Sequence, residues 1–188
     1  MNETFPEKTG RKFLNLARET LNAKFSKKQI IIPDSIDFRK SRALFVVLKG
    51  LNKNISGFPT ATYSIGDAII RATKKAAFED IQQKSLEEKE ISGITIEISI
   101  LTEIEKINGN ILNNFQPGID GLMCKFFGYT GILLPQTAKE ENLNRIGFLE
   151  KLCENAGIPK DYWKKPAISF FKFKSQVFRE PKKQSIFQ

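Results

Sequence analysis

The chain has 188 residues, of which 40% are hydrophobic and 27% are charged, so it can bury a core without a disulfide or metal. It contains no histidine, which excludes Ser-His-Asp and Cys-His catalysis and zinc sites with histidine ligands. The net charge of +9, concentrated at the two ends of the sequence, permits affinity for phosphate backbones. However, a basic face that is merely exposed to water would give the same charge balance.

Two features of the sequence bear on its compartment. The first residues contain no apolar run like a secretory leader, and nowhere do about 18 uncharged apolar residues follow one another. Cys124 and Cys153 match no metal-ligand or redox spacing, so we expect two buried free thiols. We therefore expect a cytoplasmic protein that is neither exported nor membrane-spanning.

The first third of the chain predicts a helix, a strand and a loop. Apolar residues recur at helical spacing over 9–28, and Thr9 is the predicted N-cap. The apolar, β-branched run 43–48 is typical of a buried strand. Asparagine, glycine and proline make 51–63 a predicted loop or irregular hairpin, and the charged segment 82–90 is a predicted exposed connection.

The clearest signals lie in the middle of the chain. Ser64 and Asp67 form an S-x-x-D capping box that predicts the start of a second helix. Isoleucines alternate with other residues over 94–100, which predicts a strand with one apolar face. Glu97 and Ser99 would lie on a solvated opposite face, as in an antiparallel sheet covered on one side.

The last third predicts a hairpin, a helix and a strand. Segments 122–126 and 130–134 flank a three-residue loop that contains Gly128. A helix is predicted over 144–155 and a strand over 167–177. This element order does not alternate as in a parallel βαβ fold. It predicts an α+β fold with a mostly antiparallel sheet flanked by helices.

Carboxylates are the remaining groups for acid–base chemistry, because no Walker A, dinucleotide-binding or EF-hand pattern occurs. Glu79 and Asp80 follow the second helix, and Asp120 lies between two glycines that allow close approach of a ligand. The ordinary roles of these residues are a solvated helix end and a turn. We expect no cofactor and no metal.

Aromatic and basic residues alternate in two segments. The segment 170–174, preceded by aromatic and lysine residues at 162–165, fits a core strand with a lysine-bearing outer face or a base-stacking platform. The segment 125–129 is only loosely similar to an RNA-recognition motif, because its spacing does not match.

Several segments, in their order along the chain, resemble the AMMECR domain family, also known as system protein A of the AmmeMemoRadiSam cluster. The segments that carry the resemblance are 45–48, 76–80, 96–101, 131–136 and 148–157. The resemblance covers about 12–179. We therefore expect one AMMECR-like domain over 1–188 with a flexible basic tail at 181–188. The resemblance implies a larger and a smaller lobe with a cleft between them. The family's genomic neighbours, a radical enzyme and a Memo-like protein, imply a modification pathway.

The chain departs from the family pattern at two places. The family's Leu-Arg-Gly-Cys-Ile-Gly hallmark falls on 52–57, where the cysteine becomes Ile55. The family's Gly-Val-His-Gly element falls on 118–121, where the histidine becomes Asp120. A cysteine–histidine pair is therefore absent, and Ser56 is only a candidate for a substitute nucleophile, without an obvious base.

These observations leave three hypotheses. The leading one is a protein of uncharacterised biochemical function that serves as a non-catalytic domain and binds an unknown protein or small ligand in the cleft. The alternatives are an enzyme or enzyme subunit that uses Asp120, Glu79 or Asp80, and a nucleic-acid-binding protein that acts through its basic ends. The candidate binding residues are Lys53, Asn54, Ile55, Ser56, Gly57, Phe78, Asp120, Gly121 and Gln136.

Overall fold

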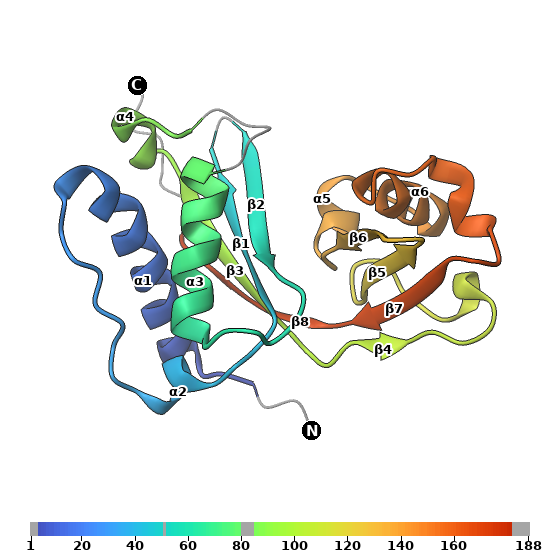
Figure 1. Ribbon diagram of the computed structural model, residues 1–188, viewed down its shortest axis with the longest axis horizontal. Coiled ribbons are helices and arrows are strands. Elements are labelled where there is room, and N and C mark those ends of the chain that lie inside the picture. The colour runs from blue at the N-terminus through green and yellow to red at the C-terminus, as the bar shows by residue number, and fades with distance from the viewer. Residues whose placement is uncertain (1–3, 51, 80–84, 182–188) are drawn as a thin grey trace. The chain divides into compact units, whose positions relative to one another are not determined.

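The computed structural model describes residues 4–50, 52–79 and 85–181, which fold into two compact units (Figure 1). The first unit contains the chain up to Ile100 and again from Gln176, and the second contains Leu101–Ser175. Each unit has its own four-stranded sheet and its own hydrophobic core. The α+β class with antiparallel sheets flanked by helices is confirmed.

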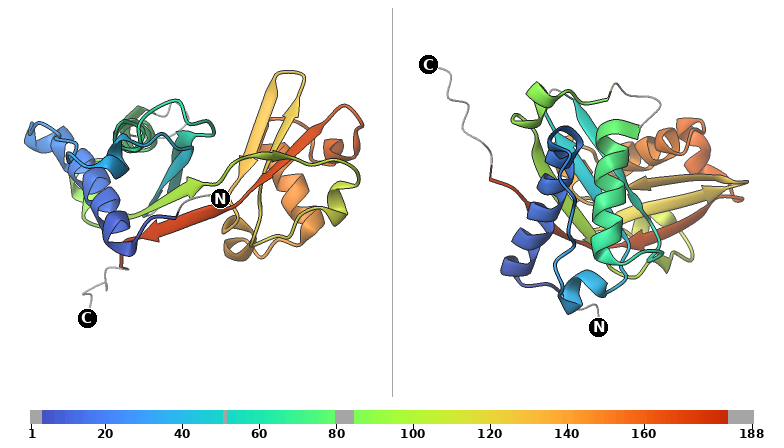
Figure 2. Two further views of the ribbon diagram at one scale, coloured as in Figure 1. Left: turned by 90° about the horizontal axis from the view of Figure 1, so that it is seen from below. Right: turned by 60° about the vertical axis from the view of Figure 1, so that its left-hand side comes forward.

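The first unit packs helices on one face of a sheet with the strand order β2-β1-β3-β8. Strands β1 and β2 are antiparallel, as are β1 and β3. Figures 1 and 2 show α1 and α3 side by side over this sheet. Phenylalanine, leucine and alanine side chains of the helices form one hydrophobic core with the isoleucines of β3. The elements are α1 (Glu7–Ser26), α2 (Ile36–Arg39), β1 (Leu44–Lys49), β2 (Lys53–Phe58), α3 (Ile65–Lys74), η1 (Lys75–Glu79), α4 (Glu88–Ile91), β3 (Thr95–Leu101) and β8 (Ser175–Arg179).

The second unit has the strand order β4-β7-β5-β6, and its described pairs are antiparallel. Its core joins leucine, cysteine and phenylalanine side chains from the sheet and from α6. The elements are β4 (Glu105–Lys106), η2 (Ile111–Asn113), β5 (Gly121–Phe126), β6 (Tyr129–Leu133), α5 (Thr137–Glu140), α6 (Arg145–Asn155), η3 (Lys160–Lys164) and β7 (Ser169–Phe173).

Of the two predicted helix N-caps, Ser64 is confirmed and Thr9 is wrong. Ser64 caps α3, because its hydroxyl accepts a hydrogen bond from the Asp67 backbone N–H at 3.2 Å, so this prediction is confirmed. Thr9 is not the cap of α1, because the helix begins at Glu7 directly after Pro6. Proline fixes φ near the helical value and lacks an N–H, which suits the start of a helix. The Thr9 hydroxyl instead donates to Asp37 Oδ2 at 3.2 Å.

Three predicted strand and loop boundaries need correction. Of the two interpretations of 51–63, the hairpin is correct for 53–58, because these residues form β2 and pair antiparallel along the whole length of β1, and the loop is wrong there. The hairpin loop has two residues instead of three, since Tyr129 already pairs with Phe126. The single strand predicted over 167–177 is divided at Lys174 into β7 and β8, which belong to different sheets.

The second face of β3 is buried, contrary to the predicted solvated face. Glu97 and Ser99 are both 0% exposed. The Glu97 carboxylate is compensated by cations from the two neighbouring strands: Lys49 Nζ lies 3.0 Å from its Oε2 and Arg179 Nε lies 2.6 Å from the same oxygen. A carboxylate can be buried only when such partners replace its hydration.

Two predicted segments fall partly outside the described residues. Of the connection predicted over 82–90, residues 82–84 lie outside them, and the end of the segment forms the start of α4. Of the tail predicted over 181–188, only Pro181 is described, and it is exposed.

Gly10 lets α1 approach β8, since a Cβ atom at this position would lie 1.9 Å from Cδ1 of Phe178. We expect Gly10→Ala to lower the free energy of unfolding by about 1–3 kcal/mol through overpacking. Gly93→Ala is the matched control, because its added Cβ would meet nothing nearer than 3.5 Å. Urea unfolding measures both variants, and equal midpoints for the two would contradict this packing.

Both cysteines are free and buried, as predicted. Burial, with a contribution from Cys124, raises the pKa of Cys153 from 9.0 to about 11. Between these values the unfolded chain loses the thiol proton while the folded chain keeps it, so stability present below pH 9.0 is lost as the pH rises through about 11.

We therefore expect the free energy of unfolding to fall with pH in this range, with Cys153 contributing on the order of 1 kcal/mol per pH unit. Urea unfolding at several alkaline pH values measures the slope. Cys153→Ala should give a shallower slope than the unmodified chain, whatever the variant's stability at neutral pH. Parallel slopes would show that other groups, such as lysines, cause the decline.

Candidate anion-binding pocket

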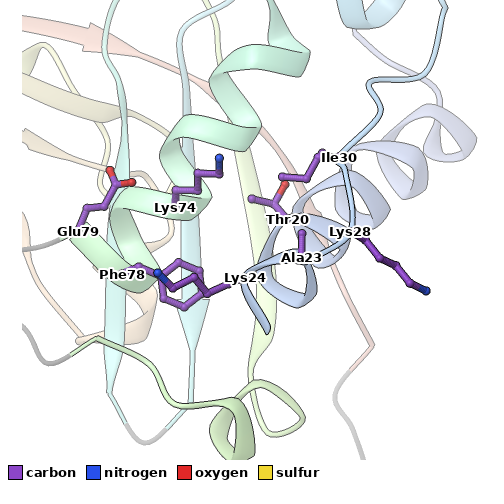
Figure 3. A pocket seen from close by; sticks show the side chains of 8 residues that line it. All are labelled: Thr20, Ala23, Lys24, Lys28, Ile30, Lys74, Phe78 and Glu79. Carbon is purple, nitrogen blue, oxygen red and sulfur yellow. The ribbon is translucent and has the colours of Figure 1, made fainter. Parts of the chain in front are cut away.

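A pocket of about 440 Å³ opens in the first unit between the C-terminal part of α1 and the end of α3 with η1 (Figure 3). Its lining combines three lysines and one carboxylate with hydroxyl, aliphatic and aromatic groups. The lining residues are Thr20, Ala23, Lys24, Lys28, Ile30, Lys74, Phe78 and Glu79. Two of them, Phe78 and Glu79, are candidates from the sequence.

The π-helical segment η1 places Phe78 and Glu79 at this pocket. Helix ends leave backbone carbonyls without intrahelical partners, and π-helical turns occur frequently at functional sites. Here the side chain of Asn54 donates from Nδ2 to the Ala76 carbonyl at 3.0 Å, and the Leu86 N–H donates to the Ala77 carbonyl at 2.9 Å. These two bonds fix the segment. Ala76 and Ala77 are small and buried, so η1 lies close to the sheet.

Phe78 forms an aromatic wall of the pocket. Its ring makes an edge contact with Phe25, with 6.0 Å between ring centroids. The Lys24 ammonium lies 5.7 Å from the centroid of Phe78. A cation at this distance from a ring is attracted by its π-electrons. The wall therefore presents an apolar surface and a positive charge side by side.

The charges of the pocket favour an anion. Within the described part of the chain, Lys24, Lys28 and Lys74 take part in no ion pair. Figure 3 shows the Lys28 side chain directed away from Phe78 and Glu79, so Lys24 and Lys74 are the cations best placed to contact a ligand. Glu79 adds one acceptor for a hydrogen-bond donor. The Thr20 hydroxyl donates to the Leu16 carbonyl at 2.8 Å.

The candidate residues of the hallmark segment all lie on β2 but differ in orientation. Asn54 is 4% exposed and points to the helical layer through its bond to Ala76. Lys53, Ile55 and Gly57 alternate with Asn54 along the strand and so belong to the opposite face, and Ser56 is half-buried. A Cβ atom on Gly57 would lie 2.6 Å from the Phe45 ring, so the unit itself fills the space beside this glycine.

The candidates Asp120, Gly121 and Gln136 belong to the second unit. Asp120 closes a turn, because its Oδ2 accepts a hydrogen bond from the Gln116 N–H at 2.8 Å. A Cβ atom on Gly121 would lie 2.4 Å from the Phe173 ring, so this glycine serves packing. Gln136 is half-buried directly before α5.

The structure thus brings together Asn54, Phe78 and Glu79 around η1 and places the other described candidates elsewhere. Asp80 lies outside the described residues. The sequence did not single out the lysines of the pocket. The only signal for Lys24 and Lys28 is the basic face of the first helix, and nothing connects Lys74 with them before the fold is known.

The described residues contain no group of three or more cysteine, aspartate or glutamate side chains arranged to hold a metal ion. The helices of the described residues lack the combination of length and hydrophobicity that a membrane span requires.

The fold and pocket define a two-unit α+β protein with a basic ligand-sized pocket in its first unit. The AMMECR1 family model matches residues 14–178, so the chain belongs to the AMMECR1 family.

Relatives and a solved structure agree with this assignment. Protein TV1384 of Thermoplasma volcanium is 32% identical, covering 91% of this chain and 89% of that protein. A protein of Methanosarcina mazei is 33% identical over 93% and 92% of the two chains. The crystal structure of the uncharacterized protein PH0010 from Pyrococcus horikoshii superposes with a TM-score of 0.86 at 28% identity, covering 94% of this chain and 93% of that chain.

Replacing the donor in the Asn54–Ala76 hydrogen bond should loosen η1. In Asn54→Asp the amide becomes a carboxyl group, which leaves the Ala76 carbonyl without its donor or places a buried charge beside it. We expect a loss of about 1–3 kcal/mol in the free energy of unfolding. Hydrogen exchange should also accelerate at 76–79.

Asn113→Asp is the matched control, because Asn113 is exposed in η2 of the second unit. If exchange at 76–79 is unchanged in Asn54→Asp, the hydrogen bond does not hold the segment in place.

Proposed function

We propose that this AMMECR1-family protein is a non-catalytic binding domain of an AMMECR-type pathway, and that its pocket holds an anionic group of a small ligand or protein partner. The observation that carries the proposal is the pair of lysines, Lys24 and Lys74, which line the pocket together with Phe78 and have no ion-pair partners in the described part of the chain. A phosphate or carboxylate would receive charge-assisted hydrogen bonds from these ammonium groups.

The size and lining of the pocket indicate the chemistry of the ligand. A volume of about 440 Å³ lies within the range of small-molecule sites, which is about 300–1,000 Å³. Phe78 offers a flat apolar surface beside the lysines, and Glu79 offers an acceptor. The ligand that fits best has an anionic group, an apolar or aromatic part and a hydrogen-bond donor.

The pocket supports binding rather than carboxylate catalysis. A carboxylate suits acid–base catalysis near neutral pH when the fold buries it and positions it beside the reacting group. Glu79 is the one carboxylate among the described residues that line the pocket, and it is exposed. Asp120 belongs to the second unit, where its carboxylate accepts the Gln116 N–H.

Two further expectations remain part of the proposal. The family match extends over both units, which supports one AMMECR-like domain over 1–188. The two free, buried thiols support a reducing compartment such as the cytoplasm.

Removing the pocket lysines should weaken anion binding. We expect the double variant Lys24→Gln/Lys74→Gln to bind inorganic pyrophosphate at least about tenfold more weakly, because each charge-assisted bond contributes roughly 1.5–3 kcal/mol. Isothermal titration calorimetry at constant ionic strength measures the affinity.

Lys8→Gln/Lys12→Gln is the matched control, because both lysines are exposed on α1 and the change in net charge is the same. We expect the control to bind like the unmodified chain. If both double variants weaken binding equally, the affinity for pyrophosphate depends only on net charge, and the pocket is not its binding site.

A further inference from the structure

Two aromatic side chains project from the tip of the β5–β6 hairpin in the second unit. Phe127 is 81% exposed and Tyr129 is 53% exposed. By contrast, the aromatic strand β7 is a core strand, with Phe170 and Phe173 both buried. The exposed rings of this unit therefore lie at the hairpin tip and not on β7.

The turn geometry makes Phe127 an unexpected residue. Phe127 has φ of 42° and Gly128 has φ of 91°, so both residues of the two-residue turn adopt left-handed conformations. Asparagine or glycine occupies such a first position at lower cost than a bulky side chain. The chain thus carries a large exposed ring where folding favours a small polar residue, and such strain is a basis for a functional hypothesis.

Neighbouring rings extend the tip into a continuous aromatic surface. Phe126 makes edge contacts with Phe127, at 4.7 Å between centroids, and with Tyr162 of η3, at 5.3 Å. The Lys165 ammonium lies 5.6 Å from the centroid of Tyr162. The structure therefore joins two segments, 125–129 and 162–165, that are far apart in the sequence.

The charge around these rings is positive. Lys164 and Lys165 are exposed at the end of η3, and Lys164 lies 5.3 Å from the centroid of Trp163. Lys125 is exposed on the opposite face of the hairpin, 5.5 Å from the centroid of Phe171. The acidic residue within η3 is Asp161.

We propose that the hairpin-tip surface, formed by Phe126, Phe127, Tyr129, Tyr162, Lys164 and Lys165, binds single-stranded nucleic acid. Exposed rings offer stacking faces to unpaired bases, and lysines beside them neutralise the phosphate backbone. A duplex stacks its bases internally and cannot offer them to Phe127 or Tyr129. The surface therefore distinguishes single strands from duplexes of the same sequence.

The test is fluorescence anisotropy of the full chain with a labelled, mixed-sequence single-stranded oligonucleotide and with the same strand as a duplex. We expect tighter binding of the single strand. Phe127→Asn should weaken it at least about fivefold, because the variant no longer stacks one base. Asparagine suits the left-handed turn, so this variant should fold at least as well as the unmodified chain. Ile31→Asn, which replaces another exposed apolar residue in the first unit, should bind normally.

A second pair of variants separates this surface from the pocket. Lys164→Gln/Lys165→Gln should weaken single-strand binding and lower its log-log salt slope by about 0.7 for each phosphate that the variant no longer neutralises. Lys24→Gln/Lys74→Gln, in the pocket of the first unit, should leave it unchanged.

Four outcomes would overturn the proposal. They are no binding of either oligonucleotide, equal affinity for single strand and duplex, unchanged single-strand binding by Phe127→Asn, and displacement of the single strand by polyglutamate, whose own binding is weakened by Phe127→Asn. The last would identify an acidic polypeptide as the occupant. If no oligonucleotide binds and Phe127→Asn abolishes self-association in sedimentation, the tip is a contact between copies of the chain.

Discussion

The buried carboxylate of Glu97 is the constraint on which the first unit depends. It sits in the middle of β3 at 0% exposure and receives Lys49 from β1 and Arg179 from β8. Because an uncompensated charge in this position costs several kcal/mol, Glu97 can be buried only where β1 and β8 lie on either side of β3 and supply these cations. Glu180, directly after β8, adds a link between the sheet and α1. Its carboxylate pairs with Arg18 of α1 and accepts the Ile96 N–H of β3 at 2.9 Å. The last described strand thereby ties the sheet to the first helix.

The sheet in turn supports the pocket. Its isoleucine face packs against α1 and α3, and its edge strand β2 supplies Asn54, whose amide binds the Ala76 carbonyl. That bond holds η1 so that Phe78 and Glu79 face the end of α1. The hallmark segment of the family resemblance therefore contributes a support for the pocket through Asn54. The pocket therefore depends on helix packing, on the buried Asn54 amide, and on two lysines without ion-pair partners among the described residues. Each of these residues is of an ordinary type, and the arrangement alone makes the site.

Local signals predicted the elements that local chemistry decides. The Ser64 cap, the alternating isoleucines of β3 and the helix over 145–155 follow from side-chain spacing and hydrogen bonding within a few residues. Properties that depend on distant residues were not predictable. The burial of Glu97 requires Arg179, which is 82 residues away, and the pocket joins Lys24 with Lys74 only after α1 and α3 have packed. Phe78 could be named from the sequence, whereas its lysine neighbours could not.

The residues that respond to an added anion show whether the pocket is its binding site. The measurement is a titration of the isotopically labelled full chain with inorganic pyrophosphate, followed by backbone and lysine side-chain NMR shifts at constant ionic strength. We expect saturable shifts concentrated at 20–30 and 74–79, with the largest changes at Lys24, Lys74 and Phe78. Shifts spread evenly over the exposed lysines of both units, or concentrated outside these two segments, would contradict a specific site in the pocket.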